Sequence, residues 1–170
     1  LKKGLSIVFV EKIASKEILE TLEKNNVTIM VGVPRVYKLF YDGIKNQIDS
    51  KFISRKIYNI AKKINSKKFS KIVFSKVHKK FGGHLDVMVS GGAKLDSEIA
   101  TFFNTLGFTV CEGYGLTETS PVIAVNSIKY NKVGTVGKAL YNTELRIVDE
   151  ELWARGPQIM KGYYNHPEKT

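Results

Sequence analysis

The chain has 170 residues, 43% of them hydrophobic, which suits one globular domain and excludes an intrinsically disordered chain. No run reaches the roughly 18 apolar residues of a membrane-spanning helix, and the start LKKGLSIVFV lacks the features of a signal peptide. The sequence therefore predicts a cytoplasmic protein. Because it begins with Leu1 and ends in YYNHPEKT, we expect a piece of a longer chain.

The formal charge of +11 is concentrated between Lys51 and Lys80, where acidic residues are almost absent. Such a run indicates a polyanionic partner or, alternatively, the solvated face of helices, because Ile57, Ile60, Ala61 and Ile64 recur at helical spacing. We favour the solvated face and expect no nucleic acid. Peripheral contact of these basic helices with the inner face of a membrane stays open.

Cysteine and histidine offer no metal site of the zinc type. Cys111 is the single cysteine, and His78, His84 and His166 are scattered along the chain. A disulfide within the chain is excluded, and any metal is expected to be held by oxygen atoms.

The first third of the chain has a strand, helix, strand order. SIVFV, Ser6 to Val10, is a predicted strand, and the helix SKEILETLEKNN follows, with Ser15 as its expected cap and Asn25 and Asn26 at its end. VTIMVGV is the next strand, and Pro34 marks the start of another helix.

Basic helices are expected between Phe52 and Phe81, and Gly82 and Gly83 supply the turn that ends them. The clearest unit follows: the strand LDVMVS, a helix capped by Asp96 and ended by Gly107, and the strand FTVCE. In the helix, Ile99, Phe102, Phe103 and Leu106 recur at the spacing of one buried face. Such a unit is a right-handed crossover between parallel strands. The loops SGGAK and GYGLTET therefore lie at one edge of the sheet, where open α/β sheets bind ligands.

After Pro121 the pattern changes to short alternating strands, VIAV, KVGTVGKAL, TELRIV and ELWARG. The last two differ in parity, so a turn must separate them, yet only Asp149 and Glu150 are available. Either this pair forms a tight hairpin or loop residues are missing from the sequence as given. The predicted fold class is α/β: a mostly parallel sheet flanked by helices, residues 1–129, followed by part of an antiparallel β subdomain, residues 130–170.

The two loops carry groups suited to a nucleotide and a metal ion. Gly91 and Gly92 leave the backbone uncovered, and Tyr114 offers a ring face to a base. Thr117 can donate to a phosphate oxygen, and Glu118 can bind a hard cation such as Mg²⁺. A tyrosine between two glycines is a weak motif by itself, and an ordinary turn is the alternative.

Four ordered blocks make the motif specific: SGGAKLDSEIATFF, EGYGLTETSP, GTVGKAL and ELWARGPQIMKGYYNHPE. Together they resemble the adenylate-forming superfamily of acyl-CoA synthetases, luciferases and adenylation domains. VGVPRVYKLFYDGI and KIVFSKVHKKFGGHLDVMVSGGA are most similar to the long-chain fatty acid:CoA ligases. The resemblance covers nearly the whole chain.

This resemblance implies a role for each matching residue. The implied adenine-nucleotide site comprises Gly91, Gly92, Ala93, Glu112, Gly113, Tyr114, Gly115 and Thr117. Glu112 would address the adenine edge, with a solvated charge at the strand end as the alternative, and Tyr114 would pack on the base. Thr117 would meet the α-phosphate and Glu118 would bind Mg²⁺, which makes these two the candidate catalytic residues.

The implied reaction joins a fatty acid to ATP, giving acyl-adenylate and pyrophosphate, and then transfers the acyl group to CoA. The superfamily's lysine-containing phosphate loop, its ribose-binding aspartate and its C-terminal domain with a catalytic lysine do not occur in this sequence. We therefore expect a middle piece that does not turn over by itself. The alternatives are a ligase for another carboxylate and a non-enzymatic basic module that binds polyanions.

Overall fold

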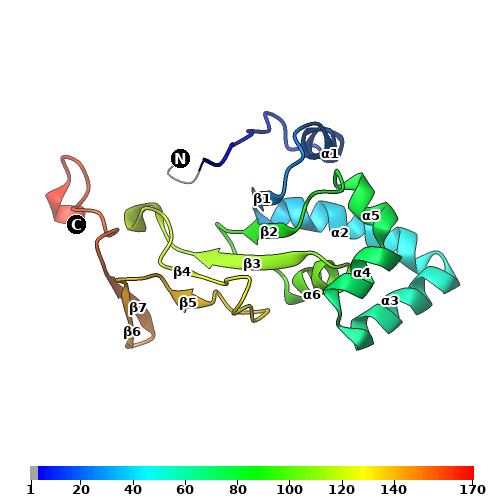
Figure 1. Cartoon of the computed structure of the whole chain (residues 1–170). Coiled ribbons are helices and arrows are strands. Elements are labelled where there is room, and N and C mark those ends of the chain that lie inside the picture. The colour runs from blue at the N-terminus through cyan, green and yellow to red at the C-terminus, as the bar shows by residue number, and fades with distance from the viewer. Residues whose placement is uncertain (1–3) are drawn as a thin grey trace.

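The computed structural model describes residues 4–170, and its centre is a five-stranded sheet in the order β1-β2-β3-β4-β5 (Figure 1). The strands are β1 (Ile29–Gly32), β2 (Val87–Ser90), β3 (Thr109–Tyr114), β4 (Ala124–Val125) and β5 (Lys138–Ala139). The first three are parallel, and β4 and β5 are added antiparallel. The predicted parallel pairing of the strands LDVMVS and FTVCE, which correspond to β2 and β3, is confirmed.

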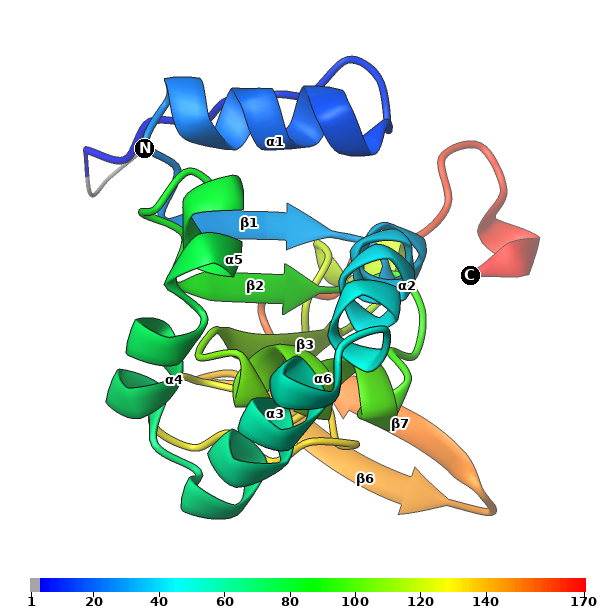
Figure 2. The ribbon, with the colours of Figure 1, turned by 90° about the vertical axis from the view of Figure 1, so that its right-hand side faces the viewer.

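Six α-helices accompany the sheet within the described residues. They are α1 (Ser15–Lys24), α2 (Pro34–Asp49), α3 (Phe52–Ile64), α4 (Lys67–Val73), α5 (Ser75–Lys80) and α6 (Ser97–Thr105). In Figure 2, α2, α5 and α6 lie in front of the sheet and α1 lies beyond its β1 edge. No helix among residues 4–170 combines the length and the apolar character needed to cross a lipid bilayer.

Aromatic rings form much of the core between the helices and the sheet. Phe81 packs edge-on against Phe40 at 5.0 Å and against Phe108 at 5.3 Å between ring centroids. Phe102 and Phe103 of α6 are fully buried, as the helical periodicity predicts. Tyr37 of α2 is also buried, and its hydroxyl donates to the carbonyl oxygen of Val89 at 2.8 Å. This bond fixes α2 against the carboxyl end of β2.

Local sequence rules explain some of the helix ends. Pro34 is the first residue of α2, Asp96 Oδ1 accepts from the N–H of Glu98 at 2.7 Å, and Gly107 after α6 has φ +99°. The expected cap at Ser15 is wrong, because the N-cap of α1 is Ala14 and no side chain caps it. Asn25 ends α1 as predicted.

The predicted strand Ser6 to Val10 is also wrong. This segment has no regular secondary structure and no strand partner among residues 4–170, and its side chains are exposed, Phe9 to 86%. Strand propensity alone did not suffice, because a strand needs a neighbour to receive its backbone hydrogen bonds.

The second sheet is the hairpin of β6 (Glu144–Val148) and β7 (Glu151–Arg155). Asp149 and Glu150 link the strands with φ of +48° and +67°, the geometry of a two-residue primed turn. Of the two alternatives for Asp149 and Glu150, the structure shows the tight hairpin. β5 was expected in the antiparallel subdomain, but it pairs with β4 in the first sheet, so the sheet crosses the proposed boundary at residues 129 and 130.

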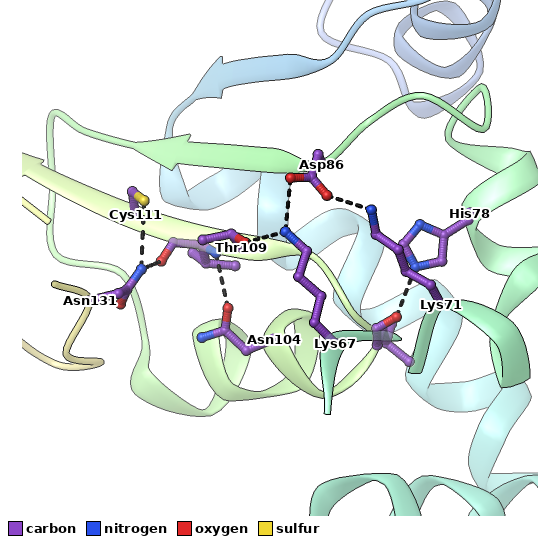
Figure 3. Close-up of polar contacts among 10 residues, drawn as sticks. Lys67, Lys71, His78, Asp86, Asn104, Thr109, Cys111 and Asn131 are labelled. Carbon is purple, nitrogen blue, oxygen red and sulfur yellow. Dashed lines mark hydrogen bonds and ion pairs between the residues drawn. The ribbon is translucent and has the colours of Figure 1, made fainter. Parts of the chain in front are cut away.

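A polar cluster at the amino ends of β2 and β3 ties α4 to the sheet (Figure 3). Lys67 Nζ lies 2.8 Å from Asp86 Oδ2 and 2.7 Å from Thr109 Oγ1, and Lys71 Nζ lies 2.5 Å from Asp86 Oδ1. Burial by itself raises the pKa of Asp86, but the bonds from the two lysines outweigh it and lower that pKa. His78 of α5 donates from Nε2 to the carbonyl oxygen of Leu106 at 2.9 Å.

Candidate active site

The two glycine loops meet at the carboxyl edge of the sheet, as the parallel strands require. Ser90 at the end of β2 pairs with Glu112 of β3. The N–H of Gly91 donates to the carbonyl oxygen of Gly32 at 3.1 Å, which brings the end of β1 to the same place. The carboxyl ends of β1, β2 and β3 therefore lie together at this edge of the sheet.

A cleft of about 660 Å³ opens there, lined by both loops, by residues 31–33 at the carboxyl end of β1 and by residues 121, 122 and 125. A second cleft, of about 460 Å³, lies beside it and is lined by Ala93, Lys94, Glu112 and residues 134–136. Gly92, Gly113 and Gly115 line both. The site residues implied by the sequence resemblance, Gly91 to Ala93 and Glu112 to Glu118, therefore border two adjoining spaces.

The glycines of the site differ in how much space surrounds them. A Cβ atom added to Gly113 would meet no atom nearer than 3.9 Å, and the same holds for Gly91. These positions leave backbone open to a ligand. A Cβ on Gly115 would instead overlap the carbonyl oxygen of Pro121, so this glycine is required by the packing of the turn. Gly92 has φ +82°, which favours glycine by conformation.

Glu112 is buried, with 6% of its surface exposed, so the alternative of a solvated charge at the strand end does not hold. Its Oε2 accepts from the N–H of Leu95 at 3.4 Å. A buried carboxylate with so few partners is costly unless another donor reaches it. Because Glu112 lines the second cleft, a ligand bound there could donate a hydrogen bond to its carboxylate.

Tyr114 ends β3 with 38% of its surface exposed. The short 3₁₀ helix η1 (Thr117–Thr119) follows, and Thr117 is exposed on it. Thr119 is buried instead: its hydroxyl accepts from the N–H of Leu116 at 2.9 Å and lies 3.1 Å from the carbonyl oxygen of Pro121. Of the two hydroxyls beside Glu118, one therefore faces outward and the other holds the turn.

Glu118 has a partner that the sequence did not predict. The hydroxyl of Tyr163 donates to Glu118 Oε1 at 2.6 Å, and the N–H of Met160 donates to the carbonyl oxygen of Glu118 at 2.8 Å. The bond from Tyr163 holds the pKa of Glu118 below its ordinary value. Tyr163 belongs to one of the four family-like blocks, but nothing in the sequence placed it against a residue 45 positions away.

Ser90 is a second residue that sequence reasoning missed. Within residues 4–170, its hydroxyl is the single buried side-chain polar atom without a hydrogen-bond partner, and it lies at the wall of the 660 Å³ cleft. Native proteins leave few such atoms unpaired. An unpaired hydroxyl at a cleft wall indicates a place where a ligand or water supplies the bond.

The donor set limits what metal this part of the chain can hold. Residues 4–170 contain no group of three or more His, Cys, Asp or Glu side chains that would enclose an ion. Glu118 presents one carboxylate, and its second oxygen receives no hydrogen bond from another side chain of the described residues. One carboxylate fits Mg²⁺, which takes most of its ligands from water and phosphate.

Comparisons with known proteins identify the family to which the chain is similar. The AMP-binding enzyme family matches residues 1–164. The peroxisomal long chain acyl-CoA synthetase 7 of Arabidopsis thaliana is 34% identical over 172 residues, 84% of this chain and 24% of that protein. The long-chain-fatty-acid–CoA ligase FadD15 of Mycobacterium bovis is 31% identical over 175 residues, 91% of this chain and 29% of that protein. The chain thus spans less than a third of either relative.

Solved structures show the same fold. Apo MatB from Rhodopseudomonas palustris superposes with a TM-score of 0.65 at 24% identity, over 95% of this chain and 28% of that one. The long-chain-fatty-acid-CoA ligase FadD1 from Archaeoglobus fulgidus gives 0.62 at 17% identity, over 91% and 30%. With a family match over residues 1–164, this chain belongs to the AMP-binding enzyme family.

Proposed function

We propose that the chain forms the adenine-nucleotide side of a long-chain fatty acid:CoA ligase. Such an enzyme uses ATP to convert a fatty acid to acyl-adenylate with release of pyrophosphate, and it then transfers the acyl group to the thiol of CoA. The observation that carries the proposal is the cleft at the carboxyl edge of the sheet, bordered by Gly91, Gly113 and Glu118. The names of the relatives at 31% and 34% identity support the choice of a long-chain fatty acid.

The backbone of two glycines and the ring of one tyrosine would contact the nucleotide base. Gly91 and Gly92 let a flat base lie close to the chain, and Tyr114 at the end of β3 supplies a ring face for stacking. The buried carboxylate of Glu112 would accept a bond from an exocyclic amino group at the base edge. Adenine carries such a group at C6, where guanine carries a carbonyl oxygen, so this contact would favour ATP over GTP.

Thr117 and Glu118 would act at the phosphates. Thr117 is exposed and can donate a hydrogen bond to a phosphate oxygen. Glu118, held by Tyr163, would bind Mg²⁺, which when present neutralises negative charge on the phosphates. In both roles the residues position and stabilise the reacting group without forming a covalent bond to it.

Nucleotide binding to the 170-residue chain tests this proposal by calorimetry with AMP and GMP. Gly113→Val places a branched side chain in the lining of the cleft, at a position where a Cβ meets its nearest neighbours at 3.9 Å, an ordinary van der Waals contact. Gly43→Val, on the exposed side of α2, is the control for the same substitution outside the cleft, because its Cβ meets no atom within 4 Å. We expect AMP to bind the control and wild type in preference to GMP, and to bind Gly113→Val at least tenfold more weakly. Equal AMP affinity in all three proteins would refute the site.

A further inference from the structure

The chain after β7 is attached to the turn that follows β3 through one residue. The N–H of Met160 donates to the carbonyl oxygen of Glu118 at 2.8 Å, and the hydroxyl of Tyr163 donates to Glu118 Oε1 at 2.6 Å. Within residues 4–170, these are the two hydrogen bonds that join residues 159–170 to the rest of the chain. In Figure 1 this segment lies at the same end of the molecule as the loop after β3. Glu118 is therefore both the proposed metal ligand and the attachment point of the segment.

Packing contributes little to this attachment. None of residues 159–170 is buried, and Tyr163 and Tyr164 are exposed to 43% and 90%. Segments with few buried apolar contacts open locally at a low cost in free energy. Docking of residues 159–170 therefore depends on the two hydrogen bonds to Glu118.

The segment itself holds Tyr163 in place. The N–H of Tyr163 donates to Thr170 Oγ1 at 2.9 Å, and the N–H of His166 donates to the carbonyl oxygen of Tyr163 at 3.2 Å. A Cβ added to Gly162 would approach the Thr170 side chain to 2.8 Å, so the two ends of this stretch are in close contact. Tyr163 thus belongs to a closed loop, and the position of that loop determines where its hydroxyl lies.

The bond from Tyr163 leaves one oxygen of Glu118 for a metal ion. Oε1 accepts from Tyr163, and Oε2 receives no hydrogen bond from another side chain in the part of the chain that the structure describes. A carboxylate that is already held in one rotamer loses less conformational entropy when it binds a cation. Hydrogen bonds to metal-binding carboxylates commonly strengthen metal binding by about 10- to 100-fold.

We propose that Tyr163 is a positioning residue for the metal-bound nucleotide, and that residues 159–170 form a latch whose docking is coupled to nucleotide binding. This coupling rests on the proposed function, in which Glu118 binds Mg²⁺ together with ATP. The latch and the metal ion use different oxygens of Glu118, so each stabilises the carboxylate orientation that the other requires. The coupling is reciprocal: docking of the latch strengthens binding of the metal-bound nucleotide by the same factor by which that nucleotide strengthens docking.

A positioning role and a purely structural role for Tyr163 differ in which nucleotide they affect. If the hydroxyl only fastened the segment, its loss would weaken AMP and magnesium-bound ATP alike. If it orients the metal ligand, its loss weakens the nucleotide that carries the metal. AMP lacks the β- and γ-phosphates that such ions bridge, so the comparison between AMP and ATP separates the two roles.

Calorimetry on the 170-residue chain tests the positioning role. The affinity for ATP is measured with Mg²⁺ and with EDTA, the ratio of the two is the gain from the metal, and AMP is measured in parallel. We expect Tyr163→Phe to lower this ratio about tenfold and to change the AMP affinity by less than about twofold. Tyr164→Phe removes the hydroxyl of the adjacent, exposed tyrosine and should keep the wild-type ratio. Because Tyr163 acts through Glu118, the double variant Tyr163→Phe/Glu118→Gln should have the same ratio as Glu118→Gln alone.

Hydrogen exchange of the Met160 amide reports docking of the latch, because this N–H is bonded to Glu118. In wild type the amide should exchange more slowly with ATP and Mg²⁺ than without nucleotide. Tyr163→Phe should exchange faster than wild type in both conditions, and Tyr164→Phe should match wild type. Far-UV circular dichroism checks that each variant is folded.

The two measurements distinguish failure of the latch from failure of the proposed function. If Glu118→Gln loses the gain from the metal but Tyr163→Phe keeps it, Tyr163 is not a positioning residue and the proposed function stands. Equal exchange of the Met160 amide with and without ATP and Mg²⁺ would refute the coupling. Failure of wild type to bind AMP would refute the nucleotide site itself, and the coupling with it.

Discussion

The hydroxyl of Tyr163 lies 2.6 Å from the carboxylate of Glu118, so the segment after β7 is bonded to the turn that follows β3. The N–H of Met160 reinforces this contact through the carbonyl oxygen of Glu118. One oxygen of the proposed metal ligand is thereby fixed, while the other has no side-chain partner among residues 4–170. Tyr163 acts as a positioning residue for Glu118.

Removing the Tyr163 hydroxyl should raise the pKa of Glu118 toward its ordinary value, because that hydroxyl is the main cause of the lowered pKa. The Glu118 carboxyl carbon, followed by NMR through a pH titration, reports this directly in Tyr163→Phe. Tyr164→Phe removes the hydroxyl of the adjacent, 90% exposed tyrosine and should leave the titration unchanged. An identical pKa in wild type and Tyr163→Phe would mean that the bond does not persist in solution.

Glu118→Gln should impair adenylation in a ligase that contains this chain, by about 10²-fold. A neutral amide attracts a hard divalent ion far less than a carboxylate does. Fatty acid-dependent pyrophosphate exchange at varied Mg²⁺ concentration measures the effect, with Glu168→Gln as an exposed control outside the cleft. The metal role is rejected if rate and Mg²⁺ dependence match those of wild type.

Gly115→Ala should destabilise the chain by about 1–3 kcal/mol, because its Cβ would overlap the carbonyl oxygen of Pro121 and force the turn to shift. Gly113→Ala, two residues earlier in β3, gives its Cβ only ordinary van der Waals contacts at 3.9 Å and should change stability by less than about 0.5 kcal/mol. Urea denaturation of both variants gives the comparison. Similar losses in both would show that the two glycines do not differ as the packing indicates.

Ser90→Ala should stabilise the chain by about 1 kcal/mol, since it removes a buried hydroxyl that has no partner among residues 4–170. Thr119→Val is the contrasting change: its hydroxyl is buried and bonded, and its loss should cost about 1–3 kcal/mol. Both values come from urea denaturation without ligand. A destabilised Ser90→Ala would indicate that water already satisfies the hydroxyl.

Acid should weaken the fold partly through His78. Burial lowers the pKa of this imidazole in the folded chain, while the unfolded chain takes up the proton near pH 6.5. The contribution of His78 is therefore fully present above pH 6.5 and decreases below it, by at most about 1.4 kcal/mol per pH unit. The free energy of unfolding measured at pH 7.5 and 5.5 should fall less in His78→Gln than in wild type. His84→Gln, an exposed control, should behave as wild type does.

The elements that the sequence predicted well are those set by local patterns. The α6 periodicity, the cap at Asp96 and the pairing of β2 with β3 depend on residues near one another in the chain, and parallel pairing then places both glycine loops at one edge. The candidate cleft could be located for this reason.

Two of the features that the sequence did not predict correctly depend on partners that are distant in the chain. Ser6 to Val10 has strand composition, but no strand among residues 4–170 receives its hydrogen bonds. The bond from Tyr163 to Glu118 spans 45 residues. Composition and residue spacing do not predict strand pairing or side-chain hydrogen bonds between distant segments, because these contacts form only in the folded chain.

β1 is an edge strand of the five-stranded sheet, and this affects the solubility of the protein. Within residues 4–170, β1 pairs with β2 alone, and Ile29 and Val31 are exposed to 50% and 77%. An open edge with apolar side chains is a template for the same strand of another molecule. Concentrated solutions of the chain should therefore polymerise edge to edge into β-rich aggregates, and a lysine introduced by Val31→Lys should raise the solubility limit by interrupting that growth.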